Sequence, residues 1–436
     1  MSIVEKSLGE EMLALIDRTV ALHPRIQAMR DEARETFLRL GLPENKAEEF
    51  RHTPIARLLQ KNLKLDAQSS ASVSAPKSED LIIPGLDAHA IVIVNGVYNP
   101  DLSSINTASG IEIKSLSEAV DNGDTQVLEH IGKYADHAQD GFSAWNAAAW
   151  SNGVYVRIAD NTVIDKPVLI HYWHDATNGQ VITTNRNLFF IGRSSEVTII
   201  EKYSSAGNSN HFSNNVTEAV VSDNAALNLY TIQHDAGNRY QYALTQIYQQ
   251  NASRVNTFTF TLSGKLVRNN LQLTLDGEGI ESHMFGLYLI SGDTLADNHT
   301  VVDHRKPNSF SNEIYKGIMD GSSRGVFNGK IYVRPHAQKT NAFQANRNIL
   351  LADSATVNTK PQLEIWADDV KCSHGCTTGQ LDEEAMFYLQ TRGIEKETAR
   401  AMMLYAFATE ILNNVKHPEL KAYFDRLVSE RLHKNF

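Results

Sequence analysis

The sequence of 436 residues has only two cysteines, no excess of basic residues and no apolar run of the ~18 residues that span a bilayer. Two cysteines cannot form a disulfide framework in a chain of this length. The formal net charge of −10 argues against general nucleic-acid binding, which requires a basic surface. The first residues, MSIVEKSLGEEMLALIDRTV, are acidic where a signal peptide has a basic start. We therefore expect a cytoplasmic protein that binds neither nucleic acid nor membranes.

The N-terminal part of the chain has the pattern of helices. Apolar residues recur at helical spacing through residues 1–65, and Gly41 and Pro43 end the second helical segment. The stretch 66–80, DAQSSASVSAPKSED, is rich in Ser and Ala and has no periodicity, which predicts a flexible linker or lid. The sequence therefore predicts an N-terminal helical domain and linker over residues 1–80.

Helical spacing returns near the C-terminus. The segment 397–412 is apolar on nearly every side, and such a helix must be buried in its own domain or against a partner. Gly393 can end the helix before it, and Pro418 suits the first position of the helix after it. We expect a C-terminal helical domain over residues 376–436.

Between these ends, from about residue 90 to 370, short β-branched and aromatic runs such as VTIIEKY and NTFTFTL follow one another. No helix-length amphipathic segment is expected between them. A small cluster of Asp, Asn, Ser or Gly returns before many of these runs, mostly at intervals of roughly 25–35 residues and once at a longer one. It occurs at Asp160-Asn161, Ser194-Ser195, Asp223-Asn224, Asn251, Asp276-Gly277, Asp320-Gly321 and Asp353-Ser354.

The returning cluster favours a solenoid, because one coil of two or three strands with turns has this length. A large antiparallel β-sandwich would give similar strand runs but no reason for the cluster to return. A parallel β-helix over residues 81–375 is therefore the favoured architecture.

Both cysteines lie in WADDVKCSHGCTTGQLDEE, as Cys372 and Cys376, with His374 midway between them. The preceding residues predict a strand, in which the three side chains share one face and the cysteines lie about 13 Å apart. Two thiolates on one zinc ion need their sulfurs within about 4 Å, so a closed metal site here is disfavoured. A redox pair is also disfavoured, because a strand lacks the helix N-terminus that activates such thiols. Either the thiol of Cys372 or Cys376 is buried and His374 bonds a neighbouring backbone group, or His374 is one ligand of a site that another subunit completes.

Two other polar clusters are candidates for chemistry. His299, Asp303 and His304 stand close together, as in a metal or acid–base site, but a solvated turn is the favoured interpretation. The second cluster is basic and consists of Arg334, His336, Lys339 and Arg347. It could face a phosphate or an acidic partner, although a solvated rim of the solenoid is favoured.

The segment DDVKCSHGCTTGQLDEEAMFYLQTRGI resembles the C-terminal signature of the SufB/SufD family, scaffold proteins of the Suf iron–sulfur cluster assembly system. The preceding stretch, from RGVFNGKIYVRPHAQKTNAFQANRN to LEIWADDVKCSHG, resembles the last coils of that family's β-helix. SufB-like sequences carry CEHEA at this place, so CSHGC makes the chain SufD-like. The resemblance implies a mainly β protein, with a right-handed parallel β-helix flanked by N-terminal and C-terminal α-helical domains.

The resemblance also implies a function, that of a non-ATPase subunit in a SufBCD-type scaffold complex. His374 is implied to face a cysteine of a SufB-like subunit across a heterodimer and to help hold the nascent iron–sulfur cluster as a shared metal ligand. Cys372 matches the cysteine of the motif, whereas no role is carried over to Cys376. The cluster is expected to be bound transiently in the complex and not tightly in the isolated chain, which could instead form a homodimer.

The C-terminal helices are implied to dock a SufC-like ABC ATPase. This agrees with the absence of a phosphate loop from the sequence, so that any nucleotide hydrolysis belongs to the partner and this chain is not expected to be an enzyme. The N-terminal segment 45–59, NKAEEFRHTPIARLL, also resembles an element of the family, and we expect it to provide helix packing and a turn at Pro54.

Two other functions remain as alternatives. A carbohydrate-active β-helix enzyme would need paired carboxylates in a groove. A purely structural solenoid would need no site at all.

Overall fold

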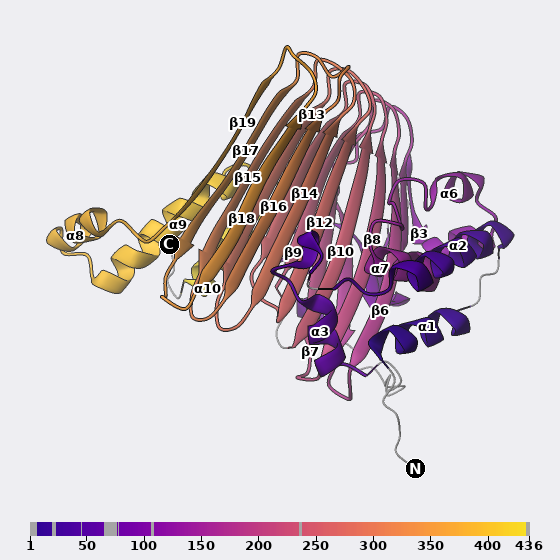
Figure 1. Ribbon diagram of the computed structural model, residues 1–436, viewed down its shortest axis with the longest axis horizontal. Coiled ribbons are helices and arrows are strands. Elements are labelled where there is room, and N and C mark those ends of the chain that lie inside the picture. The colour runs from indigo at the N-terminus through magenta and orange to yellow at the C-terminus, as the bar shows by residue number, and fades with distance from the viewer. Residues whose placement is uncertain are drawn as a thin grey trace.

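A computed structural model of the chain describes residues 7–19, 23–44, 46–64, 76, 78–105, 109–234 and 238–432. Its centre is a parallel β-solenoid of about eight coils, with helices at both ends of the chain (Figure 1). Each coil adds one strand to each of two sheets, so successive strands alternate between the sheets. The predicted parallel β-helix is confirmed, and the antiparallel sandwich is excluded.

We call the two sheets A and B. Sheet A contains ten strands: β1 (His89–Val94), β2 (Val97–Ser104), β5 (Val168–Asp175), β7 (Glu196–Ala206), β9 (Ala226–Gln233), β11 (Arg254–Thr261), β13 (Glu281–Ile290), β15 (Phe310–Met319), β17 (Asn341–Leu350) and β19 (Lys371–Gly379). Sheet B contains nine: β3 (Ile111–Ser115), β4 (Val154–Ile158), β6 (Val181–Ile191), β8 (His211–Val221), β10 (Arg239–Gln249), β12 (Leu266–Leu275), β14 (Leu295–His304), β16 (Arg324–Val333) and β18 (Thr356–Ile365).

The main core lies between the two sheets. Side chains alternate along each strand, so every second residue points inward and stacks on its in-register neighbour in the next coil. Val168, Ile199 and Leu229 form one such column on β5, β7 and β9, and all three are buried. The apolar strand runs of the sequence therefore become continuous columns inside the solenoid.

The returning Asp/Asn/Ser/Gly cluster forms a stack of corners between the sheets. Asn161, Ser194, Asn224 and Ala252 all have a positive φ, between 53° and 58°, where the chain turns from sheet B to sheet A. The amide of each donates to a carbonyl in the corner of the next coil, at 2.7 to 3.0 Å. Polar residues that tolerate the left-handed conformation are therefore needed once per coil.

The one longer interval has a structural cause. The corner at Asp276-Gly277 still leads from sheet B to sheet A, whereas those at Asp320-Gly321 and Asp353-Ser354 lead from sheet A back to sheet B. The clusters noted in the sequence thus lie on the opposite edge after β13, while the left-handed corner itself continues on the first edge at Asn308 and Lys339. The spacing within each edge remains one coil.

The beginning of the core differs from the prediction. β2 and β3 pair antiparallel with β1 and β4, and three helices lie between β3 and β4: α5 (Leu116–Asp121), α6 (Thr125–His130) and α7 (Gly141–Ala149). The expectation that no helix interrupts the strands is therefore wrong. Every residue of α7, GFSAWNAAA, is buried, so the segment lacks the polar face that marks an amphipathic helix.

The N-terminal helices cover the outer face of sheet B, as predicted for a helical N-terminus. They are α1 (Leu8–Arg18), α2 (Pro24–Leu40) and α3 (Ile55–Asn62), and together with α7 they share a core with apolar residues of β8 and β10. Trp145 of α7 stacks on Phe212 of β8 with ring centroids 5.9 Å apart. Of the predicted linker 66–80, residues 66–75 and 77 lie outside the described part, and a short helix, α4 (Ser78–Leu81), follows.

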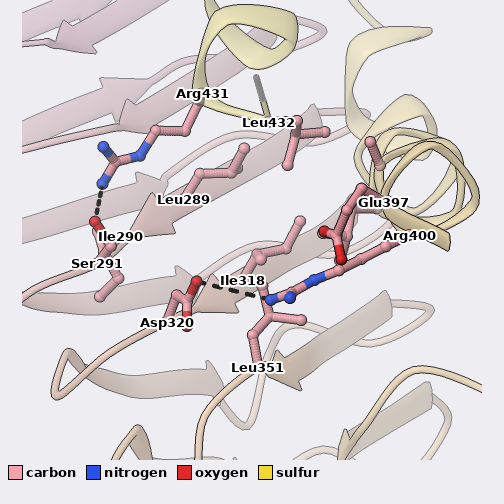
Figure 2. Close-up of a pocket in the computed structure, with 12 residues that line it drawn as sticks. Leu289, Ile290, Ser291, Ile318, Asp320, Leu351, Glu397, Arg400, Arg431 and Leu432 are labelled. Atoms are coloured by element: carbon pink, nitrogen blue, oxygen red, sulfur yellow. Dashed lines mark hydrogen bonds and ion pairs between the residues drawn. The ribbon is translucent and has the colours of Figure 1, made fainter. Parts of the chain in front are cut away.

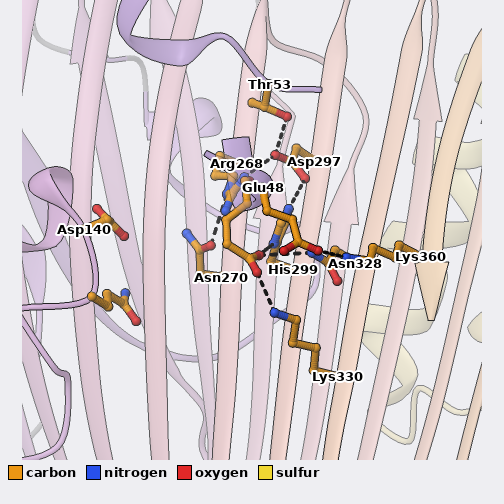
Figure 3. A network of polar contacts seen from close by, with 12 residues as sticks. Glu48, Thr53, Asp140, Arg268, Asn270, Asp297, His299, Asn328, Lys330 and Lys360 are labelled. Atoms are coloured by element: carbon orange, nitrogen blue, oxygen red, sulfur yellow. Dashed lines mark hydrogen bonds and ion pairs between the residues drawn. The ribbon is translucent and has the colours of Figure 1, made fainter. Parts of the chain in front are cut away.

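A strap of residues 48–53, which begins with the short helix η1 (Glu48–Phe50), crosses the outer face of sheet B (Figure 3). The Glu49 carboxylate accepts hydrogen bonds from Asn328 and Lys330, at 3.0 and 2.5 Å, and contacts His299 at 3.1 Å. These three residues come from β14 and β16. A single carboxylate of the strap therefore joins two coils.

A buried ion pair fixes the other half of the strap. Arg268 donates to the Glu49 carbonyl at 2.6 Å and to the Asp297 carboxylate at 2.7 Å, and its guanidinium lies over the Phe50 ring. Asp297 also accepts from the Thr53 hydroxyl at 2.5 Å. The role expected for segment 45–59, helix packing and a turn, thus omits its main contacts, which are these charged bonds.

The C-terminal helices α8 (Glu383–Thr391), α9 (Lys396–Leu412) and α10 (Pro418–Arg431) follow the last strand. α9 and α10 pack on the outer face of sheet A, where Phe424 stacks on Phe260 with ring centroids 3.8 Å apart. Pro418 is the first residue of its helix and Gly393 has a positive φ, as predicted. The nearly all-apolar segment 397–412 is buried against its own β-solenoid along one side, while Met402 remains exposed.

The corners lead to a reciprocal prediction. Asn224→Ala places a side chain with no local hydrogen-bonding group in the left-handed conformation and should lower the free energy of unfolding by about 1 kcal/mol. Ala252→Asn relieves the same strain one coil later and should raise it by up to about 1 kcal/mol. Urea unfolding of both variants measures the difference, and equal stabilities would contradict the assigned role of the corners.

The strap leads to a prediction about acid stability. The His299 contact, with Lys330 second, lowers the pKa of Glu49 from 4.5 to about 2 despite partial burial. Its contribution is therefore complete above about pH 4.5 and is lost as the pH falls toward 2. Glu49→Gln should lower the free energy of unfolding at pH 7 by about 1 kcal/mol, because a side chain that is 40% exposed is partly screened.

The control for Glu49→Gln is Glu48→Gln, which removes a fully exposed carboxylate that pairs with Lys360. We expect the Glu49 variant to lose more stability at pH 7 than the control and to show a smaller further loss between pH 4.5 and pH 2. Identical unfolding curves for the two variants would argue against the strap contacts.

Candidate functional site

The solenoid ends in an open coil. β18 and β19 are the last strands of sheets B and A, and each has a single neighbour, β16 and β17 respectively (Figure 1). Within the described residues the outer edge of each strand is unpaired. Free backbone groups on a strand edge are a ready surface for another chain.

The two free edges differ in character. β18 carries Pro361, which has no N–H to offer to a further strand. Just after it, Trp366 is 48% exposed and stacks on Tyr332, with Arg334 over both rings. Trp, Tyr and Arg are the residues that most often anchor protein interfaces. The edge of sheet B therefore presents aromatic and arginine side chains to a partner, whereas the edge of β19 presents unpaired backbone N–H and C=O groups.

β19 carries the Cys-x-His-x-Cys segment. It is an extended strand paired in register with β17 over residues 371–379, which confirms the strand predicted for this segment. Cys372, His374 and Cys376 thus lie on one face at successive two-residue steps and do not converge on one point. Among the described residues, no three His, Cys, Asp or Glu side chains are grouped to hold a metal ion.

The three side chains have different surroundings. Cys372 is half-buried against the main core, and burial raises the pKa of its thiol. His374 and Cys376 are exposed. The interpretation as a buried thiol at Cys372 or Cys376 therefore fits Cys372 in part, and the exposed His374 can meet a group that approaches the open coil.

The cluster of His299, Asp303 and His304 is not the solvated turn that the sequence favoured. All three residues belong to β14 and are buried. His304 points inward, bonds the Ser311 hydroxyl at 2.9 Å, and has its pKa lowered to about 4 by burial. His299 and Asp303 lie on the outer face, in contact with Glu49 and with arginines respectively. The three side chains therefore make no common site.

The basic residues of 334–347 lie near the open end but already have partners. Arg334 pairs with Asp303 at 2.6 Å, Lys339 pairs with Asp369, and Arg347 pairs with Glu410 at 3.0 Å. Only His336 of this group is an exposed side chain with no ion pair among the described residues. A phosphate site here would have to break several ion pairs.

Two cavities on the outer faces have their arginine side chains in contact with polar partners. A cavity of about 230 Å³ lies between sheet A and the C-terminal helices (Figure 2). Its two guanidinium groups, Arg431 and Arg400, face Ser291 at 2.7 Å and Asp320 at 3.7 Å. A cavity of about 310 Å³ beside the strap is lined by the Glu49 and Arg268 network of Figure 3. Both cavities are therefore interpreted as packing gaps, the first beside the C-terminal helices and the second beside the strap.

One C-terminal helix stands apart from the solenoid. α8 has no buried residue, and its Phe387 and Tyr388 side chains are 67% and 57% exposed. α9, in contrast, is held to β15 by Lys316, which donates to the Phe407 carbonyl at 2.9 Å and pairs with Glu410. The exposed aromatic pair of α8 is a second candidate surface for a partner.

None of the helices in the described part of the chain is long and apolar enough to cross a membrane.

Comparison with known proteins agrees with this architecture. Residues 173–407 match the family model described as "SUF system FeS cluster assembly, SufBD core domain", and residues 9–170 match "SufBD protein N-terminal region". The first match includes β19 and most of α9, and so covers the Cys-x-His-x-Cys segment and α8.

Several curated proteins are similar over most of their length. An iron–sulfur cluster assembly SufBD family protein of Synechocystis sp. is 31% identical over 92% of this chain and 90% of its own. The iron–sulfur cluster assembly protein SufD of Escherichia coli is 30% identical over 91% of each chain. The chloroplastic protein ABCI7 of Arabidopsis thaliana is 26% identical over 91% of this chain and 84% of its own. The chain therefore belongs to the SufBD family of the SUF system for iron–sulfur cluster assembly.

Proposed function

We propose that this chain is the SufD-like, non-ATPase subunit of a Suf scaffold complex in the cytoplasm, where it pairs with a SufB-like subunit and a SufC-like ATPase. The observation that carries the proposal is an exposed His374 on the last strand of the solenoid, whose outer edge is unpaired within the described residues and which lies in the segment that matches the family. In the proposed complex, the SufB-like subunit covers this open coil.

His374 is proposed as a ligand of the iron–sulfur cluster, which is the cargo of the complex. Neutral imidazole binds iron, and its place among thiolates raises the reduction potential of a cluster. The extended strand separates His374 from Cys372 and Cys376, so the other ligands have to come from the partner. A cluster with one imidazole ligand among thiolates is also bound more weakly than one with thiolates alone. Weaker binding suits a scaffold that must release the cluster it assembles.

Cys372 has a lesser part in the proposal. Its thiol is half-buried and burial raises its pKa, so the thiolate that would bind iron is disfavoured in the free chain. It can serve as a ligand only when the partner rearranges the last coil. Cys376 is exposed, but we assign it no role.

The ATPase is proposed to dock on α8, with Phe387 and Tyr388 as anchors. Two exposed aromatic side chains on a helix with no buried residue need a partner to be covered. α9 and α10 are packed on sheet A, and they attach α8 to the solenoid.

The other functions fit these residues less well. An acid–base site of paired carboxylates is not what the two outer-face cavities offer, since Glu49 is engaged with lysine and histidine and Asp320 faces an arginine. A purely structural solenoid has no use for an exposed histidine on its last strand. The open edge could also join two copies of this chain when no SufB-like subunit is present.

The first test is His374→Ala, co-expressed with the SufB-like and SufC-like subunits and reconstituted anaerobically. Loss of an outer-shell partner typically costs 10–100-fold in metal affinity, so loss of a ligand should reduce cluster content at least about tenfold. Absorption spectroscopy measures the cluster, and co-purification measures assembly of the subunits, which should be unchanged.

The controls for His374→Ala are Cys376→Ala on the same strand and His336→Ala at another exposed histidine. Both should retain the wild-type cluster content. A normal cluster content in His374→Ala, or loss of its fold, would reject the ligand assignment.

The second test concerns α8. Deleting the C-terminal helices would expose the apolar face of sheet A, so point variants are preferable. Phe387→Ala combined with Tyr388→Ala should weaken binding of the ATPase by at least about thirtyfold, as expected for loss of about 2 kcal/mol at an interface anchor. Calorimetric titration measures the affinity, and Gln390→Ala on the same helix serves as the control. Unchanged affinity would place the docking surface elsewhere.

A further inference from the structure

A polar column inside the solenoid ends at His374. Glu313, Gln344 and His374 occupy in-register positions on β15, β17 and β19, with strands about 4.8 Å apart. Glu313 and Gln344 are buried between the sheets, and His374 is the last member, on the open strand. Gln344 is therefore the side chain directly behind the proposed ligand.

The Gln344 side chain is held in a fixed place. Its amide nitrogen Nε2 donates to Glu313 Oε2 at 2.8 Å. Across the interior, Gly329 of β16 faces the same amide, and a Cβ at that position would overlap with it. Burial raises the pKa of Glu313 to about 7, although contacts with Thr300 and Gln344 oppose the shift. The Gln344 amide is thus held between the Glu313 carboxyl group and the backbone of Gly329, which has no side chain.

One atom of this clamped amide is unused. Gln344 is 3% exposed, and its oxygen Oε1 has no hydrogen-bond partner among the described residues. The neighbouring column, which runs to Cys376, differs in this respect. Asn346 donates to the Tyr288 hydroxyl at 3.2 Å, and its oxygen accepts from Asn348 at 2.7 Å. Of these two columns, as far as the described residues show, that of His374 presents a buried acceptor without a donor.

We propose that Gln344 positions His374 by accepting the N–H of one imidazole nitrogen, which leaves the other nitrogen to face the cluster. The inference rests on the proposed role of His374 as a ligand. Metal-binding histidines usually donate their second ring N–H to an oxygen, and this bond fixes both the tautomer and the ring orientation. In the open coil the ring is exposed to water. When a partner covers the coil and excludes water, Gln344 Oε1 is the in-register acceptor.

The test uses ¹⁵N NMR of the histidine rings in the full-length, cluster-free chain, free and bound to the SufB-like subunit. Gln344→Met keeps the shape of the side chain and removes the acceptor. In the wild type, His374 should hold one tautomer when the partner is bound, and in Gln344→Met it should show the tautomer mixture expected of an exposed histidine such as His52. The resonance of His374 is identified by its loss in His374→Ala.

A rescue variant separates positioning from simple damage to the interior. The double exchange Glu313→Gln with Gln344→Glu keeps one amide and one carboxyl group in the pair and places a carboxylate behind His374. It should restore the single tautomer. Ser311→Ala, which removes one buried hydrogen bond from the adjacent column, should leave the tautomer unchanged. A mixture in the wild type, no change in Gln344→Met, or no rescue by the double exchange would overturn the inference.

The cluster supplies a second measurement. Complexes with Gln344→Met should release their cluster to a chelator about tenfold faster than the wild type, the lower limit for loss of an outer-shell contact. If the tautomer depends on Gln344 but His374→Ala assembles clusters normally, the positioning stands and the proposed function fails. If His374→Ala loses its clusters while Gln344→Met releases them at the wild-type rate and keeps the tautomer, only the positioning fails.

Discussion

The backbone ladder between successive coils is the constraint on which the rest of this structure depends. From β5 to β17, each parallel strand has a neighbour on both sides, so its N–H and C=O groups are satisfied by the preceding and the following coil. This arrangement requires every coil to place its strands in register with those of the one before it. It also aligns equivalent side chains into columns, both apolar ones such as that of Ile199 and polar ones such as that of Gln344. The last coil pairs with the coil before it, but no coil follows it. The outer edges of β18 and β19 are therefore unpaired within the described residues.

The sequence could reveal the repeating part of this structure because repetition leaves a pattern. The strand runs, the corner residues such as Asn161 and Asn224, and the helical spacing of apolar residues on each flank are local features that recur or have a fixed period. The extended conformation of β19 was predictable for the same reason, and with it the separation of Cys372 from Cys376. The exposure of His374 was suggested only by the family resemblance, since the order of residues does not say whether another part of the chain covers the last strand.

Contacts between distant parts of the chain left no such pattern. Glu49 lies about 250 positions before His299 in the sequence, and no spacing rule joins a residue of an N-terminal strap to the outer face of β14. α7 escaped detection because burial on all sides removes the amphipathic period. Gln344 is an ordinary polar residue in a strand run, and only the register with Glu313 and the bare backbone of Gly329 give it a distinct environment. The surroundings of the site residues are thus set by long-range pairing and strand register, which the sequence does not reveal. The fold could be predicted because it is set by local periodicity.

The outermost strands at the two ends of the solenoid differ in direction: they are antiparallel to their neighbours at the first end and parallel at the last end. This difference limits how chains can associate through their strand edges. At the first coil the outermost strands, β2 and β3, run antiparallel to their neighbours, and β2 contains Pro100. At the last coil β18 and β19 run parallel to theirs. Head-to-tail stacking would have to join unlike edges, and it would generate an open filament. Association through last coils brings like ends together and uses up the free edges of both chains at once. For association through strand edges, this difference between the two ends disfavours open filaments.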